Sequence, residues 1–389
     1  MRLNGLVSSH DRVEETPRLG TSGGISTAHV GRDFKAIVVL FLDGGADSFN
    51  MLVPLGNCPA KDLYAEYRTV RGDVKLDPSD LLEFNTTMGT VQPCSTFGVH
   101  KSLDMVHELY QQGDAAFVAN IGSLIEPIDR VSYYDGSKQI PAQIFAHNMG
   151  QKAAQNLHPQ VGSSKGVLGR MLDQLSAQPE GYQGGAYSIA GNAKITDGEK
   201  HAPDIISPSN GAVRFWGDLA GTGYNPELTP TIRRLLAPQS SSIFGETIAA
   251  LHEAALDRSS LLADALDTVK LSETFGDTQV EQQFEQVAKL INVSSRLDTE
   301  RGVYFVKIGS FDTHSDVGLI LEEKLGQINS ALRSFTKEMK AQRWWDHVTI
   351  FSISEFGRTI TSNGLGTDHG CKMSRTRTNA PELTHRHRP

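Results

Sequence analysis

Three acidic residues follow apolar segments of the kind that form buried strands. Asp43, Asp312 and Glu355 each lie within a few residues of the end of such a segment. Ligands of open α/β sheets bind outside the carboxyl ends of the strands, so neighbouring strands would bring these carboxylates into one crevice. Carboxylates that meet repel one another, and burying them unpaired is costly. The site therefore needs a proton, a Lys or Arg side chain, or a cation.

Histidines stand beside these acids. Asp312 and His314 are two residues apart, which places both side chains on the same side of an extended chain. Asp368 and His369 form a second pair between glycines, which let the backbone approach closely. Carboxylate and imidazole groups together suit Zn, Mn or Fe, whereas carboxylates alone suit Mg or Ca. The mixed set predicts a divalent metal site, with zinc as the first choice and manganese or magnesium as alternatives.

Each of these residues also has a structural explanation. An acid after a strand often caps a helix or starts a turn, and an isolated Asp–His pair is more often a structural hydrogen bond than a metal site. Arg358 either binds an anion or forms an ion pair with Glu355. His100 and His147 could be ligands, although core or surface histidines are the commoner case.

The elements that would position these residues follow an α/β pattern. Continuous apolar, β-branched runs predict strands buried on both faces of a parallel sheet, at Lys35–Leu42, Ala115–Ile121, Val303–Ile308 and His347–Ile353. Between the last two, apolar residues recur at steps of four and three, as on one face of a helix: Leu321, Leu325, Ile328, Leu332, Phe335 and Met339. This βαβ unit implies parallel strands with helices on the faces. We therefore expect a doubly wound, mostly parallel α/β fold with helices on both faces.

Composition divides the chain into a leader, one domain and a tail. Residues 1–33 are polar and predict a flexible leader, and residues 34–370 form the predicted domain. Within that domain, residues 123–245 are rich in Gly, Ser, Pro and Gln and predict a loop-rich insertion. Residues 371–389 are basic and almost free of large apolar side chains. They cannot offset the entropy lost on ordering, so we expect a disordered tail.

Charge and cysteine content exclude several classes of function. The 389-residue chain has a formal net charge of −8 and no general basic surface, which argues against nucleic-acid binding. No apolar run approaches the roughly 20 residues that span a bilayer. Three scattered cysteines, Cys58, Cys94 and Cys371, indicate neither a disulfide framework nor a thiolate zinc site. No secretory signal is visible, so the compartment stays open.

Five segments resemble the domain-of-unknown-function family 1501, of the alkaline-phosphatase-like superfamily. They occur in the family's order and cover the chain from about residue 35 to 370: Phe41–Asn50 (FLDGGADSFN), Phe145–Asn148 (FAHN), Gly166–Arg170 (GVLGR), Phe311–Ser315 (FDTHS), and Ser354–Thr359 (SEFGRT) followed by Gly366–Gly370 (GTDHG). The last two are specific and the first fairly specific, whereas the middle two are weak alone. The resemblance implies an alkaline-phosphatase-like sheet with helices on both faces.

Catalytic relatives cleave phosphate or sulfate esters with one or two metals and a Ser or Thr nucleophile. Read onto this sequence, the resemblance implies these metal ligands: Asp43, Asp312, His314, Glu355, Asp368 and His369. Ser48 is the hydroxyl nearest to the first strand end and is the candidate nucleophile. Arg358 is the candidate anion-binding residue of the catalytic group.

The sequence also departs from the family pattern. The family usually carries Arg or a similar residue where Asp43 stands, and Phe356 follows Glu355 where relatives have His. Relatives place their nucleophile further on than Ser48, at the start of a helix. After Gly370 the tail resembles nothing in the family, so we expect that the C-terminal part of the domain is missing.

Two functions remain open at this stage. The first is a metal-dependent hydrolase acting on a small anionic phosphate or sulfate ester. The second is a non-catalytic member of the fold that binds an anionic ligand or a protein partner. The acid and histidine cluster favours the hydrolase, whereas the unclear nucleophile and Phe356 favour the non-catalytic member. Relatives are often exported, which gives an expectation about the compartment but no visible signal.

Overall fold

The computed structural model describes eight stretches of the chain. They are residues 3–7, 32–86, 92–119, 121–158, 164–214, 227–237, 242–371 and 383–384, and for residues 3–7, 130, 371 and 383–384 only the main chain is described. Among the helices in these stretches, none combines the length and the apolar content needed to cross a membrane.

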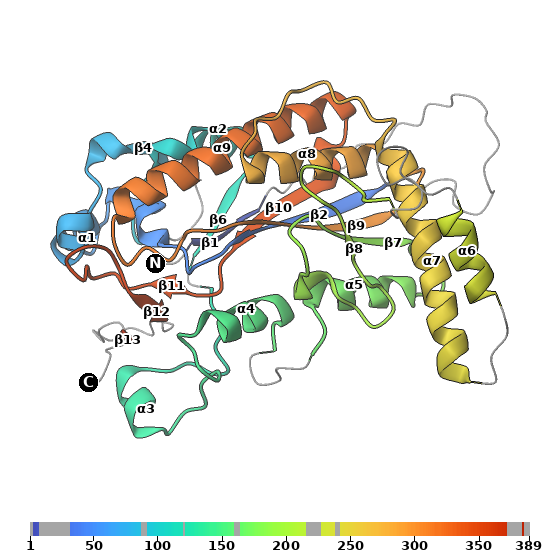
Figure 1. Ribbon diagram of the computed structural model, residues 1–389. Helices are drawn as coiled ribbons and strands as arrows, with labels where there is room; N and C mark the ends of the chain where they lie inside the picture. The colour runs from blue at the N-terminus through green and yellow to red at the C-terminus, as the bar shows by residue number, and fades with distance from the viewer. Residues whose placement is uncertain are drawn as a thin grey trace.

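A five-stranded parallel sheet forms the centre of the molecule (Figure 1). Its strand order is β10-β2-β9-β7-β8, and every neighbouring pair is parallel. The strands are β2 (Lys35–Leu42), β7 (Gly184–Ser188), β8 (Asp204–Ile205), β9 (Arg301–Ile308) and β10 (Val348–Ile353). The prediction that β2, β9 and β10 are parallel strands of one sheet is therefore confirmed.

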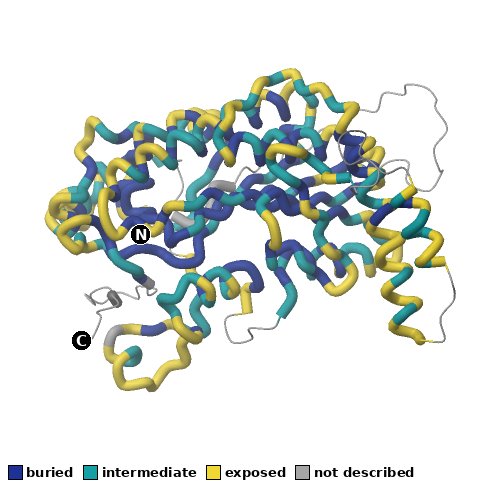
Figure 2. The backbone as a smooth tube through the Cα atoms, viewed as in Figure 1, coloured by how far each residue is buried: buried dark blue, intermediate teal, exposed yellow. Residues whose placement is uncertain are grey.

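Helices cover both faces of this sheet (Figure 1). One face carries α2 (Asp104–Gln112), α8 (Gln279–Asn292) and α9 (Val317–Gln342), and the other carries α4 (His147–Asn156) and α5 (Val167–Ser176). Alternate strand residues enter two separate apolar clusters, with Leu40 on the side of α8 and α9 and Val39 on the side of α5. The strands accordingly lie in the buried middle layer (Figure 2), as their continuous apolar runs predict.

The helix between β9 and β10 is the predicted crossover. The apolar positions of α9 are all buried, as expected for one face turned to the core: Leu321, Leu325, Ile328, Leu332, Phe335 and Met339. Asp316 at the N-cap and Arg343 at the C-cap both have positive φ, so the chain turns sharply at each end of the helix. The helix thus carries the chain from the end of β9 back to the start of β10, which lies on the far side of β2.

The prediction that Ala115–Ile121 forms a strand of the parallel sheet is wrong. β6 (Ala116–Ala119) pairs antiparallel with β1 (Leu3–Val7) and is not a strand of the five-stranded parallel sheet. All four residues of β6 are only partly buried. A short apolar run alone does not distinguish a central parallel strand from other buried segments.

The predicted flexible leader, residues 1–33, contains one described strand. Its residues Leu3–Val7 form β1, and residues 8–31 lie outside the described part.

A second, antiparallel sheet lies beside the first and carries a disulfide. Its order is β3-β5-β4, formed by β3 (Leu52–Gly56), β4 (Leu81–Asn85) and β5 (Thr96–His100), and α1 (Leu63–Arg71) connects β3 to β4. Cys58 and Cys94 are bonded across a sequence separation of 36. The scattered cysteines gave no sign of this bond, because pairing β3 with β5 is what brings them together.

The remaining elements lie around the periphery. They are α3 (Arg130–Asp135), α6 (Leu228–Leu236), α7 (Ile243–Leu266), and the small sheet of β11 (Gly357–Arg358), β12 (His369–Cys371) and β13 (Leu383–Thr384). The segment 123–245, expected as a loop-rich insertion, also contains β7 and β8 of the central sheet. Of the expected disordered tail, only the main chain at residues 371 and 383–384 is described, and the rest lies outside the described residues.

Replacing both Cys58 and Cys94 with Ser should lower the free energy of unfolding by about 4 kcal/mol, because the cross-link restricts the unfolded chain. Urea denaturation of the wild type and the double variant measures this difference. Dithiothreitol should lower the midpoint of the wild type and leave that of the double variant unchanged. Equal midpoints of the two proteins without reductant would contradict the prediction.

Candidate functional site

The candidate site lies at the carboxyl edge of the central sheet. Asp43, Asp312 and Glu355 follow the three neighbouring strands β2, β9 and β10. Two more segments reach this edge, because α4 begins at His147 and β12 begins at His369. Parallel strands end at the same edge, so the topology of the sheet assembles side chains that are far apart in the sequence.

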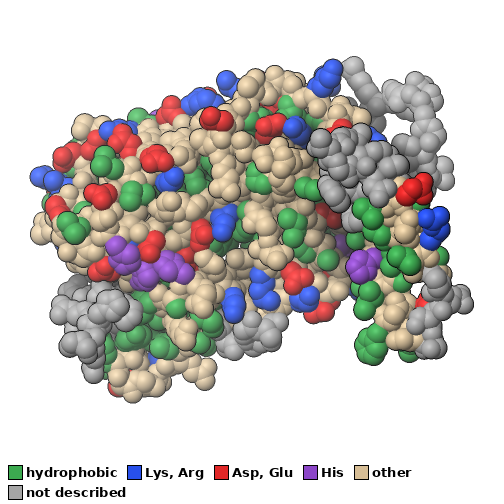
Figure 3. Space-filling view, viewed as in Figure 1, with side chains coloured by type: hydrophobic (Ala, Val, Ile, Leu, Met, Phe, Trp, Pro, Cys, Tyr) green, Lys and Arg blue, Asp and Glu red, His purple; other side chains and the backbone are tan. Residues whose placement is uncertain are grey.

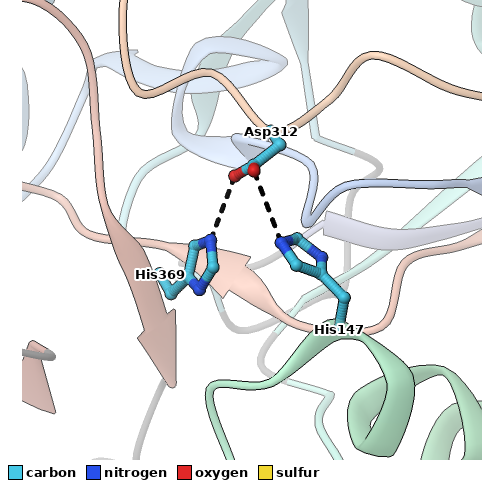
Figure 4. A group of neighbouring side chains, drawn as sticks. All are labelled: His147, Asp312 and His369. Atoms are coloured by element: carbon cyan, nitrogen blue, oxygen red, sulfur yellow. Dashed lines mark hydrogen bonds and ion pairs between the residues drawn. The ribbon is translucent and has the colours of Figure 1, made fainter.

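The carboxylate of Asp312 lies between the rings of His147 and His369 (Figure 4). Its Oδ2 is 3.4 Å from Nε2 of His147, and its Oδ1 is 3.0 Å from Nε2 of His369. One ligand atom from each residue lies within 4.8 Å of the others. Zinc bonds of about 2.1 Å place tetrahedral ligand atoms about 3.4 Å apart. The three groups therefore have a spacing that fits one shared ion after small movements.

The other nitrogen of each ring faces an oxygen that accepts hydrogen bonds. Nδ1 of His147 is 2.9 Å from Oε1 of Glu355, which also accepts from the N–H of Gly44 at 2.8 Å. Nδ1 of His369 is 2.8 Å from the carbonyl oxygen of Phe145. Both Nδ1 atoms must therefore carry the proton. A ring without a proton on Nε2 then points its lone pair at the carboxylate, as metal-ligating histidines do, whereas a ring protonated on both nitrogens donates a hydrogen bond to it.

His314 brings a third ring to the same carboxylate. Its Nε2 is 3.1 Å from Oδ1 of Asp312 and 3.1 Å from Nε2 of His369. Its Nδ1 is 3.0 Å from Oδ1 of Asp368, which also accepts from Nδ2 of Asn363 at 3.0 Å. Asp368 therefore lies behind the ring of His314, in the place that Glu355 takes behind His147.

Arg358 pairs with Asp312 rather than with Glu355. Its Nη1 donates to Oδ1 of Asp312 at 2.6 Å, its Nη2 donates to the carbonyl oxygen of Thr367, and its Nε is 3.4 Å from Oγ1 of Thr367. The guanidinium is fully buried and all three nitrogens have protein partners. It stabilises the charge of Asp312, and the role of a free anion-binding group stays a prediction.

The environment shifts several pKa values in directions that suit metal binding. Burial opposes ionisation of Asp312, but hydrogen bonds from Arg358 and His369 outweigh it and lower the pKa of this carboxyl. Burial likewise opposes ionisation of Asp368, and bonds from Asn363 and His314 again lower its pKa. Burial lowers the pKa of His369 and so favours its neutral ring. Ionised carboxylates and neutral imidazoles are the forms that bind metals.

Phe356 packs against the two histidines that flank Asp312. The ring centroid of Phe356 is 4.9 Å from that of His147 and 4.8 Å from that of His369. This chain thus places an apolar ring between the two histidines. The Phe356 ring restricts the movement of both imidazoles and offers no ligand atom to an ion. The histidines of the cluster belong to α4, β12 and the loop after β9.

Two of the predicted site residues lie outside this cluster. Asp43 accepts from Nε2 of Gln151 at 2.5 Å and pairs with Nζ of Lys307 at 3.1 Å, so both of its oxygens contact other groups. Ser48 is 3% exposed in a short 3₁₀ helix after β2, and its side chain makes no hydrogen bond to the cluster in the described part of the chain. Their predicted roles as ligand and nucleophile stay predictions.

The cluster is open to solvent on one side. The side chain of Asp312 is 43% exposed and that of His314 is 48% exposed. In the space-filling view, histidine side chains gather at the surface beside acidic ones in the region of β11 (Figure 3). Glu355, by contrast, is completely buried behind His147. A solvent molecule or a ligand can therefore reach Asp312 and His314 directly.

His147 belongs to the cluster but was not among the site residues predicted from the sequence. Nothing next to it in the sequence is acidic, and its partners Glu355 and Asp312 lie far along the chain. The sequence alone favours the commoner case of a core or surface histidine over a ligand at this position. The only signal for it was the short segment Phe145–Asn148, which is weak alone.

Comparison with known proteins identifies one family. The family model described as "Protein of unknown function (DUF1501)" matches residues 34–374. No curated protein and no solved structure matched the chain. The matched range contains every residue of the cluster around Asp312.

Gly44 holds the turn after β2 close to the loop that carries Asp312. It has φ +125°, and a Cβ there would lie 2.4 Å from the backbone nitrogen of Asp312. Gly44→Ala should therefore lower the free energy of unfolding by about 1–3 kcal/mol more than Gly364→Ala. Gly364 has φ +97°, and a Cβ added there would meet nothing within 4 Å, so it controls for backbone strain alone. Urea denaturation compares them, and equal losses would argue against the close packing.

Proposed function

This chain belongs to the DUF1501 family, and we propose that it is a metal-dependent hydrolase of phosphate or sulfate esters. One observation carries the proposal: Nε2 atoms of His147 and His369 converge on the carboxylate of Asp312, while each Nδ1 is engaged by an acceptor. The proposed ligands are these three residues, with Nε2 of His314 in reach of the same place. Zinc is the ion we expect first.

A cation resolves a conflict among these groups. When both rings are neutral and carry their protons on Nδ1, their Nε2 lone pairs face the carboxylate lone pairs, and these repel. An ion between them would accept electron pairs from both rings and from Asp312 at once. Two imidazoles and a carboxylate form a donor set typical of zinc and related transition metals and unlike the all-oxygen sets of calcium and magnesium.

The residues around the ligands would hold them in place. Glu355 fixes the proton and the orientation of His147, the Phe145 carbonyl does so for His369, and Asp368 does so for His314. Such partners orient the ring and raise the basicity of the ligating nitrogen. A divalent ion held there would polarise an ester oxygen of a bound substrate.

An anionic substrate fits the local electrostatics. Helix α4 begins at His147, and its N-cap residue Ala146 supplies no side-chain hydrogen bond to the first turn. The N-terminal end of a helix carries a partial positive charge and attracts phosphate-like groups. Lys307 lies at the same sheet edge, where its charge is paired with that of Asp43. The cation, the helix end and the open surface at Asp312 together favour a phosphate or sulfate ester.

A second function is favoured by the position of Ser48. The buried Ser48 makes no hydrogen bond to the cluster among the described residues, so no hydroxyl nucleophile has been identified there. A non-catalytic member of the family could retain the metal site and use it to bind an anionic ligand or a protein partner. The two functions share the metal site and differ in turnover.

Purified protein should contain or take up about one zinc ion, and His147→Ala should lower its zinc affinity at least about tenfold, because it removes a ligand. His252→Ala is the matched control, since His252 is an exposed histidine of α7 that contacts the carbonyl of Ile248. Elemental analysis gives the metal content, and titration against a chromophoric chelator gives the affinity. Wild-type protein that binds no zinc would contradict the proposed site.

Hydrolysis separates the two functions. Zinc-loaded protein should release nitrophenol from p-nitrophenyl phosphate or p-nitrophenyl sulfate, and removal of the ion with EDTA should abolish the release. His147→Ala should lose this activity and His252→Ala should keep it. Zinc binding without turnover of either ester, or of a wider panel of phosphate and sulfate esters, would favour the non-catalytic function.

Glu355 should act on zinc only through His147. Glu355→Ala should lower zinc affinity by about 10- to 100-fold, because the ring loses the acceptor that orients it. Glu355→Gln keeps an oxygen that can accept from both His147 and Gly44, so its zinc affinity should stay close to that of the wild type. Competition with a chelator measures both. An equal loss in the two variants would instead indicate that Glu355 binds the ion directly.

A further inference from the structure

A fully buried ion pair lies behind the candidate site. Asp47 and Arg71 are both 0% exposed, and Nη2 of Arg71 donates to Oδ2 of Asp47 at 2.8 Å. Arg71 ends α1, and Asp47 caps the short helix after β2. Nη1 of Arg71 also donates to the carbonyl oxygens of Thr359 and Ile360 at 3.3 Å. The pair thus contacts the segment that directly follows Arg358.

Thr367 connects this ion pair to Arg358. Its Oγ1 donates to Oδ2 of Asp47 at 3.2 Å and lies 3.4 Å from Nε of Arg358. Its carbonyl oxygen accepts from Nη2 of the same arginine. A hydroxyl has one proton to donate, and that of Thr367 is donated to Asp47, so Oγ1 of Thr367 presents a lone pair to the guanidinium of Arg358. Thr367 is itself 0% exposed.

Arg358 then contacts Asp312 from the buried side. A guanidinium is planar and rigid, so fixing two of its nitrogens on Thr367 also fixes the direction of the third. That third nitrogen, Nη1, donates to Oδ1 of Asp312 at 2.6 Å. Asp312 is itself 43% exposed, and Arg358 is its partner on the buried side. The rotation of the carboxylate, and hence the place of Oδ2 beside His147, depends on this bond.

We propose that Asp47 and Arg71 form a positioning network that acts through Thr367 and Arg358 to set the carboxylate of Asp312 for metal binding. The proposal rests on the metal site proposed above and adds residues that never touch the ion. The network places two carboxylates and two guanidinium groups in alternation, so the charges of the three buried groups and of the partly exposed Asp312 balance. Its members come from the turn after β2, α1, β11 and the segment before β12.

Thr367→Val is the sharpest test of this network. It removes one hydroxyl and keeps the branched shape, whereas removing Asp47 or Arg71 would leave an unpaired buried charge and endanger folding. Thr367→Ser keeps the hydroxyl and should restore function. Thr336→Val is the matched control, because Thr336 is buried in α9 and its Oγ1 has no hydrogen-bond partner among the described residues.

The full-length proteins are compared by zinc affinity and by the visible absorption of the cobalt(II)-loaded form. Thr367→Val should bind zinc about tenfold more weakly than the wild type, the scale expected when a ligand loses its orienting partner. Its cobalt spectrum at saturation should also change, since the direction of Asp312 changes. Thr367→Ser and Thr336→Val should match the wild type in both measurements. A purely structural role of Thr367 would lower the melting temperature and leave the cobalt spectrum of the folded protein unchanged.

Two failures can be told apart. Wild-type affinity and an unchanged cobalt spectrum in Thr367→Val would overturn the positioning network while the metal site stands. A wild-type protein that binds neither zinc nor cobalt would overturn the metal site, and the network with it. Circular dichroism verifies that each variant is folded. If Thr367→Val does not fold, Thr367→Ala lacks the same hydroxyl with a smaller side chain and is measured in its place, with the same two outcomes deciding.

Discussion

The negative charge of Asp312 must be compensated at a sheet edge that also gathers the carboxylates of Glu355 and Asp368. Arg358 approaches it from the buried side, and the rings of His147, His314 and His369 approach it from the open side. A single guanidinium cannot satisfy both carboxylate oxygens and the ring nitrogens that face them. Three features of the structure surround this one charge. They are the strand ends that bring the residues together, the acceptors that orient each ring, and the buried pair of Asp47 and Arg71 behind Arg358.

The sequence predicts the parts of the fold that depend on local patterns. β2, β9 and β10 are continuous apolar runs, and α9 repeats its apolar residues with the period of a helix. The parallel arrangement follows from them, because a strand, a crossover helix and a strand form one unit. β6 was misplaced because its pairing with β1 depends on tertiary contacts, and β7 was missed because Gly, Ala and Ser dominate it.

The sequence predicts that Asp312 and Glu355 lie at one edge of the sheet, and the structure places both beside His147. Asp312 and Glu355 follow similar strands, and nothing in the sequence separates a residue that would contact the proposed ion from one that contacts a ring. The structure separates them by burial, since Glu355 is completely buried behind His147 and Asp312 is half exposed. The place of His147 could not be predicted from the sequence, because its partners Glu355 and Asp312 are adjacent to it only in the folded chain.

The distances along the chain between these residues govern when the site can exist. Nδ1 of His369 contacts the carbonyl of Phe145 across a sequence separation of 224 residues, and His147 contacts Glu355 across 208. During synthesis the ribosome therefore adds most of the central sheet after α4 and before β12. A growing chain that has already formed β2 and β9 still lacks Asp312, His314 and His369. An ion at the proposed site could bind with full affinity only after β12 has docked, so its binding would mark the completed sheet edge rather than guide its assembly.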